Sequence, residues 1–227
     1  MTSTPLKVLP LVPPFNMETL GVKGLICGTG KNLIPGCLNS DLFRLELGGN
    51  HSEYGKITLL DPLIYYLQYD LTQPLPLAEG SLHWVYSEHF IEHLTLEGAI
   101  GWLSEVYRIL KPNACVRIST PDLQKYTQAY VENDKLFFSE HARRLKTLGF
   151  ENVPERRAWM LNQIFHNWSH HWIYDVEELK HIAREAGFGS ESVTVCAYRQ
   201  GRDPEVCSLD LPVRNDESLY VEIMKNA

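Results

Sequence analysis

LICGTGKNLIPG, residues 25–36, is an apolar run that ends in a glycine-rich turn. A phosphate-binding P-loop would need Ser or Thr after Lys31, where this chain has Asn32, and a glycine where it has Leu25. The dinucleotide fingerprint G-x-G-x-x-G would need a third glycine at Leu33, which lets a helix pack closely beneath a pyrophosphate. The turn therefore disfavours a pyrophosphate ligand and leaves a ligand that contains adenosine but no phosphate.

The composition is that of an ordinary globular chain, with 227 residues, 44% of them hydrophobic and 22% charged. This length suits one domain with an insertion. A formal net charge of -7 disfavours nucleic acid as a partner, because binding to phosphates needs a basic face. The densest basic cluster, Arg143, Arg144 and Lys146, is expected to be a solvated helix face. The expected partner is a small-molecule substrate.

The cysteine pattern and the N-terminal prolines point to a cytoplasmic protein. The five cysteines form no C-x-x-C pair and have no zinc-binding spacing, which indicates a reducing compartment. Pro5, Pro10, Pro13 and Pro14 interrupt the apolar run that a signal peptide needs. No run approaches the roughly 20 apolar residues of a spanning helix, so no membrane partner is expected. A homodimer is left open.

Strands and helices alternate along most of the chain. We expect strands at 24–27, 37–42, 64–71, 82–87, 115–120, 192–198 and 218–225, helices at 95–110 and 176–187, and mostly helix at 122–165. Residues 46–57 are expected to form a loop, because they contain three glycines.

This order predicts an α/β fold, a Rossmann-like doubly wound sheet of about seven strands. The last strand follows without a crossover helix and should be antiparallel. Residues 1–23 would be a lead-in or lid, and residues 24–227 the ligand-binding domain, with a helical insertion at about 122–170 after the fifth strand.

Polar residues or glycine follow four of the predicted strands, at Gly28, Asp41, Asp70 and Ser87. The carboxyl ends of parallel strands form the usual ligand edge of such a sheet. Asp41 could accept both ribose hydroxyls of an adenosine, and Asp70 with the Leu71 backbone could bind adenine. The glycine turn could then approach a charged amino-acid tail. The predicted binding set is Cys27, Gly28, Thr29, Gly30, Asp41, Asp70, Leu71 and Ser87.

Several motifs together carry a family resemblance. Residues 70–123 contain Asp70-Leu71 with a Pro-Leu-Pro step, SEHFIEHL (87–94), EVYRILKPNA (105–114) and RISTPDL (117–123). With residues 25–42 and 170–188, they resemble the class I S-adenosylmethionine-dependent methyltransferases of the type 11-like group. The resemblance covers roughly residues 24–199 and implies S-adenosylmethionine (SAM) as methyl donor. The chain departs from the usual pattern at Cys27 and at Asn113-Ala114, where the family has glycines.

Methyl transfer from a sulfonium is an in-line displacement, so the protein mainly aligns the acceptor with the methyl group. A general base is needed only if the acceptor must lose a proton, and histidine suits that role near neutral pH. The predicted catalytic residues are His89 and His171 as base candidates, with Tyr126 and Tyr130 as a substrate-facing pair at i, i+4 on a helix.

The pattern H-x-x-E-H at 89–93 raises a metal hypothesis, with His166, His170 and His171 available to complete the ligand set. The resemblance implies that members with E-x-x-E-H at this block hold acceptor oxygens through a divalent ion. Most type 11-like members have the Glu-His pair without a metal. We therefore expect no metal.

The expected function is methyl transfer to a small-molecule acceptor. Two alternatives stay open at this point. The same pocket could cyclise or transfer the aminocarboxypropyl chain of SAM, releasing methylthioadenosine. The chain could also bind SAM without catalysis.

Overall fold

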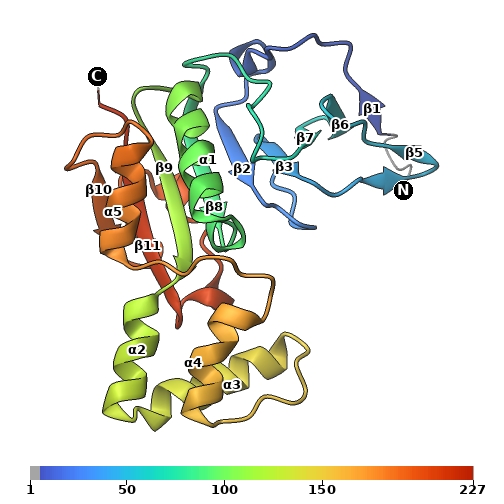
Figure 1. Cartoon of the computed structure of the whole chain (residues 1–227). Helices are drawn as coiled ribbons and strands as arrows, with labels where there is room; N and C mark the ends of the chain where they lie inside the picture. Colours follow the sequence, from blue (N-terminus) through green and yellow to red (C-terminus); the bar gives the residue numbers. More distant parts are fainter. Residues whose placement is uncertain (1–5, 227) are drawn as a thin grey trace.

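The computed structural model describes residues 6–226, in which nine strands form one mixed sheet (Figure 1). In chain order these strands are β1 (Lys7–Val8), β2 (Gly24–Cys27), β3 (Leu38–Asp41), β6 (Ile57–Asp61), β7 (Ile64–Gln68), β8 (Leu82–Glu88), β9 (Leu110–Pro121), β10 (Val193–Cys196) and β11 (Ser218–Met224). The order across the sheet is β1-β6-β7-β3-β2-β8-β9-β11-β10.

The central strands β7, β3, β2, β8 and β9 are parallel, and β11 is antiparallel to β9. The predicted Rossmann-like α/β fold with an antiparallel last strand is therefore confirmed. Three further strands, β1, β6 and β10, pair antiparallel at the two margins of the sheet.

The predicted loop at 46–57 contains a hairpin of β4 (Glu46–Leu47) and β5 (Asn50–His51), followed by the start of β6. Gly48 and Gly49 form its turn with φ of 59° and 81°. Two successive positive φ angles belong to the type I′ turn that joins tight hairpins. The loop prediction was wrong here because these glycines build a hairpin instead of only breaking a strand.

Two long helices cover one face of the sheet. α1 (Leu96–Ile109) and α5 (Val176–Glu185) pack against each other and against Leu25, Leu38 and Val85 in the main core. Thr95 and Asp175 cap these helices, their side chains accepting hydrogen bonds from Gly98 N and Glu178 N.

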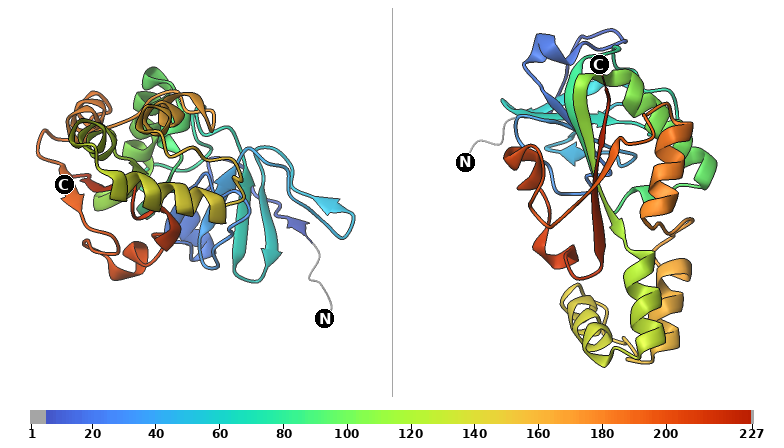
Figure 2. Two further views of the ribbon diagram at one scale, coloured as in Figure 1. Left: turned by 90° about the horizontal axis from the view of Figure 1, so that it is seen from below. Right: turned by 90° about the vertical axis from the view of Figure 1, so that its left-hand side faces the viewer.

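The opposite face is covered mainly by the chain between β10 and β11, which contains α6 (Pro204–Cys207) and η3 (Pro212–Arg214). Val206 packs there against Ile26 and Trp84. Figure 2 (right) shows this red segment across the sheet from α1 and α5.

Residues 28–56, all within the described part of the chain, contain no helix. A turn at 28–37 joins β2 to β3, and the hairpin with β6 joins β3 to β7. The alternation of strand and helix therefore begins only at β8, and the edge beside β3 and β7 has no covering helix.

The N-terminal segment belongs to the main core. β1 extends the sheet beside β6, and η1 (Met17–Leu20) follows. Phe15 and Met17 are buried, and Glu18 pairs with Lys111 near the start of β9. Residues 15–22 thus lie at the amino ends of the parallel strands, and residues 1–5 of the predicted lead-in or lid lie outside the described residues.

The predicted helical insertion consists of α2 (Leu123–Glu132), α3 (Lys135–Thr147) and α4 (Arg157–His166). These helices extend beyond the end of β9 (Figure 1) and have their own core around Phe138, Met160 and Ile164. Among residues 6–226, no helix has the length and apolar character needed to cross a membrane.

Candidate functional site

The sheet order brings the predicted strand-end residues to one edge. Gly28 follows β2, Asp41 ends β3, and Ser87 is the last residue but one of β8. Asp70 comes two residues after β7. These four strands are parallel neighbours in the order β7-β3-β2-β8. Their carboxyl ends therefore meet at the edge where such sheets bind ligands.

The glycine turn after β2 has a left-handed backbone, with φ of 67° at Gly28 and 55° at Gly30. A Cβ atom at position 28 would lie 2.8 Å from the ring of Phe90, so this position needs glycine for space as well as for conformation. The Gly28 amide donates to Ser40 O over 3.0 Å, which ties the turn to β3.

Asp41 joins the two loops at this edge. Its Oδ2 accepts a hydrogen bond from Gly30 N at 2.8 Å, and its Oδ1 accepts one from Leu42 N at 2.7 Å. The side chain is half-buried, and Oδ1 also accepts from Phe43 N at 3.4 Å, so it is Oδ2 that keeps acceptor capacity for a further donor. Asp70 caps its own turn, because its Oδ1 accepts from Thr72 N at 3.0 Å and from Thr72 Oγ1 at 2.7 Å.

Cys27 and Ser87 are buried side chains at the ends of β2 and β8. Burial raises the pKa of the Cys27 thiol to about 12, so the thiol stays protonated and is no nucleophile at neutral pH. Ser87 Oγ has no hydrogen-bond partner among the described residues.

A cavity of about 210 Å³ lies beside the glycine turn, and we call it the strand-end cavity. Gly28 and Thr29 line one side, and Glu88 and Arg214 contribute charged groups. Burial raises the pKa of Glu88 above its usual value. Glu88 Oε1 accepts a hydrogen bond from Leu211 N at 2.8 Å, which holds the chain before β11 over this cavity.

A second cavity of about 120 Å³, here the insertion cavity, lies between η2 (Ile91–His93) and the insertion helices. Its lining includes Trp168 and Glu217. His89 and Arg214 line both cavities, so the two spaces adjoin. Each is smaller than the about 300 Å³ at the lower end of ordinary ligand pockets.

His89 stands between the two cavities with both ring nitrogens engaged. Ser218 Oγ donates to Arg214 O at 2.7 Å, so it must accept from His89 Nε2, which is 2.7 Å away. Nδ1 lies 3.0 Å from Glu92 Oε1. Burial alone would lower the pKa of His89, but the Glu92 carboxylate raises it overall. Both ring nitrogens thus have protein partners, which disfavours the expected role of His89 as a general base.

The structure does not bring Tyr126 and Tyr130 to the two cavities. Tyr126 is fully buried in the insertion, where its hydroxyl donates to Glu217 Oε2 at 2.6 Å. Burial raises its pKa well above the usual value. The Tyr130 ring lies 5.0 Å from the Arg157 guanidinium carbon. The i, i+4 spacing put the two rings on one helix face, but that face packs on the insertion core.

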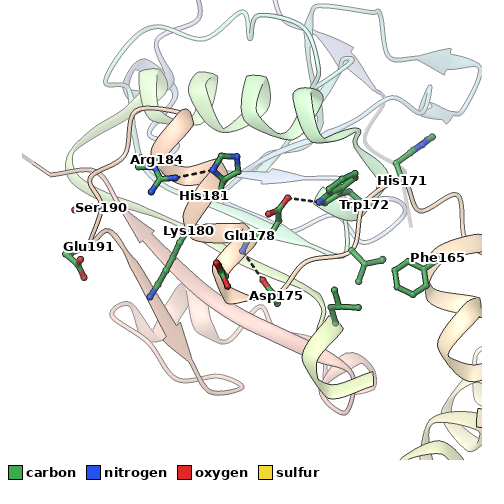
Figure 3. A pocket seen from close by; sticks show the side chains of 13 residues that line it. Phe165, His171, Trp172, Asp175, Glu178, Lys180, His181, Arg184, Ser190 and Glu191 are labelled. Carbon is green, nitrogen blue, oxygen red and sulfur yellow. Dashed lines mark hydrogen bonds between the residues drawn. The ribbon is translucent and has the colours of Figure 1, made fainter. Parts of the chain in front are cut away.

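His171 is exposed and lines a separate groove of about 930 Å³ that runs along α5 (Figure 3). Trp172 and Phe165 are its large apolar residues. The Trp172 indole donates to Glu178 Oε1 at 2.9 Å. His171, the second candidate for the base, therefore lines neither the strand-end cavity nor the insertion cavity.

The sequence reasoning missed Arg214 and Glu217, which lie in the long chain between β10 and β11. A signal was present, because an antiparallel last strand begins at the edge where the parallel strands end. The charged run RNDE (214–217) directly before β11 could therefore have been assigned to the ligand edge.

No family model matches the sequence, and no curated protein matches it. Among solved structures, a complex of the Haloferax volcanii Trm112 methyltransferase activator with a methyltransferase matches with a TM-score of 0.50 and 13% identity, over 95% of this chain and 85% of that one. A phosphoethanolamine N-methyltransferase 2 from Haemonchus contortus has a TM-score of 0.49 and 14% identity, over 91% of this chain and 50% of that one. This chain thus spans about half of that enzyme.

A SAM-dependent methyltransferase from Archaeoglobus fulgidus has a TM-score of 0.47 and 13% identity, over 90% of this chain and 86% of that one. Identities at this level establish the fold alone. The strand order and the match at a TM-score of 0.50 agree, and the chain has the fold of the class I SAM-dependent methyltransferases.

Proposed function

We propose that this protein transfers the methyl group of SAM to a small polar acceptor bound in the insertion cavity. The observation that carries the proposal is the pair of adjoining cavities at the carboxyl ends of the strands, with His89 and Arg214 common to both. One cavity would hold part of the donor and the other the acceptor, so that the two meet beside these side chains.

The residues at the edge fit SAM in both chemistry and placement. Glu88 and Arg214 offer one charge of each sign to the zwitterionic amino-acid tail, and the Gly28 turn gives close backbone approach. At about 210 Å³ the strand-end cavity has room for only part of the molecule. The adenosine would lie over the edge beside Asp41 and Asp70, which has no covering helix among residues 28–56.

Bound SAM supplies an electrophilic methyl group, so the protein's contribution is alignment and exclusion of water. Arg214, Glu217 and His93 give the insertion cavity a polar lining, which favours an acceptor with charged or hydrogen-bonding groups. Both nitrogens of His89 have protein partners, so an acceptor that must lose a proton would pass it to another lining group, of which His93 and Glu217 are the candidates.

The test is mass spectrometry of the nucleoside products after incubation of the purified protein with SAM, with and without a small-metabolite extract. S-adenosylhomocysteine that forms only with extract supports the proposal. Methylthioadenosine formed without extract would contradict it and indicate chemistry on the aminocarboxypropyl chain. Binding of SAM without any turnover in either tube would favour a non-catalytic role.

A charge variant links that activity to the site. Arg214→Gln removes the cation that both cavities share, and we expect the acceptor-dependent rate to fall at least about tenfold, the scale of one hydrogen bond to a charged group. Arg156→Gln is the matched control, because Arg156 is exposed at the start of α4. Equal activity of the two variants would argue against this site.

A further inference from the structure

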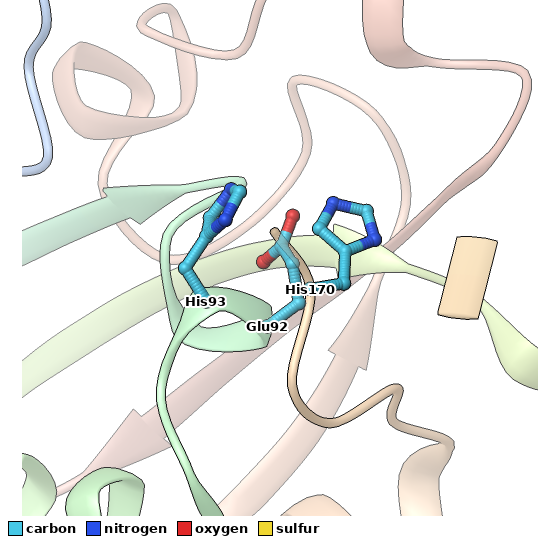
Figure 4. Close-up of side chains that lie close together, drawn as sticks. All are labelled: Glu92, His93 and His170. Atoms are coloured by element: carbon cyan, nitrogen blue, oxygen red, sulfur yellow. The ribbon is translucent and has the colours of Figure 1, made fainter. Parts of the chain in front are cut away.

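Three side chains near the insertion cavity converge without bonding to one another. Glu92 and His93 belong to η2, and His170 belongs to the loop after α4. One potential ligand atom from each lies within 4.8 Å of the other two, and Figure 4 shows the three groups pointing toward one another. Among the described residues, no hydrogen bond joins any two of these three side chains.

Each imidazole is oriented by a backbone carbonyl. His170 Nδ1 lies 2.7 Å from Ile164 O, and His93 Nδ1 lies 3.4 Å from Ser169 O. A carbonyl can only accept, so Nδ1 carries the proton in both rings, and each neutral ring keeps its lone pair on Nε2. A hydrogen bond from the other ring nitrogen is the usual support of a metal-binding histidine.

The carboxylate is supported in the same way. Glu92 is fully buried, and its Oε2 accepts a hydrogen bond from Thr120 Oγ1 at 3.1 Å. Its Oε1 has the close ion-pair contact with His89 but no aligned hydrogen-bond donor among the described residues. His89 offsets the Glu92 charge at Oε1, and the remaining carboxylate lone pair lies beside two imidazole lone pairs with no hydrogen bond among the three side chains. Three acceptors that face one another in this way suit a bound cation.

We propose that Glu92, His93 and His170 bind a divalent transition-metal ion of the Zn²⁺ class, with an open coordination position toward the insertion cavity. Two imidazoles and one carboxylate suit such an ion, whereas Mg²⁺ and Ca²⁺ prefer oxygen ligands. Three protein ligands with a fourth position left open is the pattern of a catalytic zinc site. The cavity adjoins all three side chains, so the fourth ligand can be water or an acceptor group.

Ion binding would require the cluster to contract. With metal–ligand bonds of about 2.1 Å, the ligand atoms of a tetrahedral site lie about 3.4 Å apart, so the separations, now within 4.8 Å, must shorten by up to about 1.4 Å. Rotation of His93 and His170, both only partly buried, can supply this movement. The proposed ligands differ from those suggested by the H-x-x-E-H pattern at 89–93. His89 is hydrogen-bonded to Ser218, and His166 and His171 are exposed. The proposal replaces the expectation that the chain binds no metal.

The site would also connect two parts of the molecule. Glu92 and His93 follow β8, whereas His170 lies in the loop that returns from the insertion to α5. The bound ion would therefore cross-link the insertion and the sheet, whether or not methyl transfer occurs.

The experiment is metal binding to the purified full-length chain after treatment with a chelator. We expect isothermal titration with Zn²⁺ to show one equivalent, and Co²⁺ to give the visible absorption of a four- or five-coordinate site. His170→Ala and His93→Ala should each weaken Zn²⁺ binding at least about 100-fold, because loss of a ligand exceeds the 10–100-fold effect of losing an outer partner. His166→Ala, from the same histidine-rich segment, should bind like the parent chain.

A folding control separates loss of ligand from loss of structure. The metal-free His170→Gln variant should show the same thermal transition as the metal-free parent, while only the parent is stabilised by added Zn²⁺. Absence of stoichiometric binding to the parent would overturn the proposal, as would equal loss in the His166 and His170 variants. These measurements need no SAM, so their outcome is independent of the proposed methyl transfer.

Discussion

A single carboxylate, that of Asp41, determines the shape of the candidate SAM site. It holds Gly30 N on one side and Leu42 N on the other, so it positions the turn after β2 relative to the end of β3. In many α/β sheets a helix follows the glycine turn and stabilises it, but residues 28–56, all described, form none. The turn therefore depends on this side-chain contact more than on a neighbouring helix.

We expect Asp41→Asn to weaken binding of S-adenosylhomocysteine by about tenfold to 100-fold, as measured by isothermal titration. The substitution removes the charge and leaves one acceptor oxygen, and hydrogen bonds to charged groups are worth about 1.5–3 kcal/mol. Asp61→Asn changes an exposed carboxylate at the end of β6 and should bind normally. Parent-like affinity in the Asp41 variant would remove Asp41 from the site.

His89 shows how far single residues can be assigned from sequence. Its place was predictable, because it follows a strand at the ligand edge. Its role was not, because the state of the ring depends on Ser218, which is 129 residues away. The position of Asp41 was easier to predict, because the sheet order alone places a carboxylate at the end of a strand.

At the scale of elements, the chain between β10 and β11 is held to the sheet by a buried ionic group. Arg117 on β9 is fully buried, and it pairs with Asp210 at 2.6 Å and Glu222 at 3.1 Å. Leu211 and Arg214 follow directly along the chain and line the strand-end cavity. The ionic group thus positions one wall of the candidate site.

Asp210→Ala should lower the free energy of unfolding by about 3–5 kcal/mol, measured by urea denaturation, because it leaves the Arg117 charge buried with only Glu222. The triple variant Arg117→Met/Asp210→Leu/Glu222→Leu should recover a large part of this loss, since it replaces all three buried charges with apolar side chains and leaves none unpaired. A single variant as stable as the parent would show that this pair does not hold the segment.

The helices and central strands were predictable from local pattern, whereas the margins of the sheet were not. α1 and α5 have a capping residue, a helical apolar period and a clear end, and β2 is a short apolar run. β1 has only two residues and β6 begins directly after a turn, so their formation depends on pairing with a distant neighbour. The sequence of one short segment does not identify the distant strand with which it pairs.

The described residues form three apolar clusters, one on each face of the sheet and one inside the insertion. Polar contacts join the insertion to the chain before β11. Tyr126 donates to Glu217 Oε2 at 2.6 Å, and His141 Nδ1 lies 3.2 Å from Asp216 Oδ2. Because the insertion cavity lies at this junction, the stability of the junction decides how easily that cavity opens.

Tyr126→Phe should destabilise the insertion by about 1–3 kcal/mol, because Glu217 Oε2 then loses a buried donor. We expect the amides of α2, α3 and α4 to exchange faster by about tenfold for each 1.4 kcal/mol lost, while those of β2 and β8 stay protected, because separate cores can open separately. Tyr130→Phe is the control in the same helix, since the Tyr130 ring contacts the Arg157 guanidinium through its face. Faster exchange in both cores would show instead that sheet and insertion unfold as one unit, in which case opening of the acceptor cavity would require unfolding of the SAM site as well.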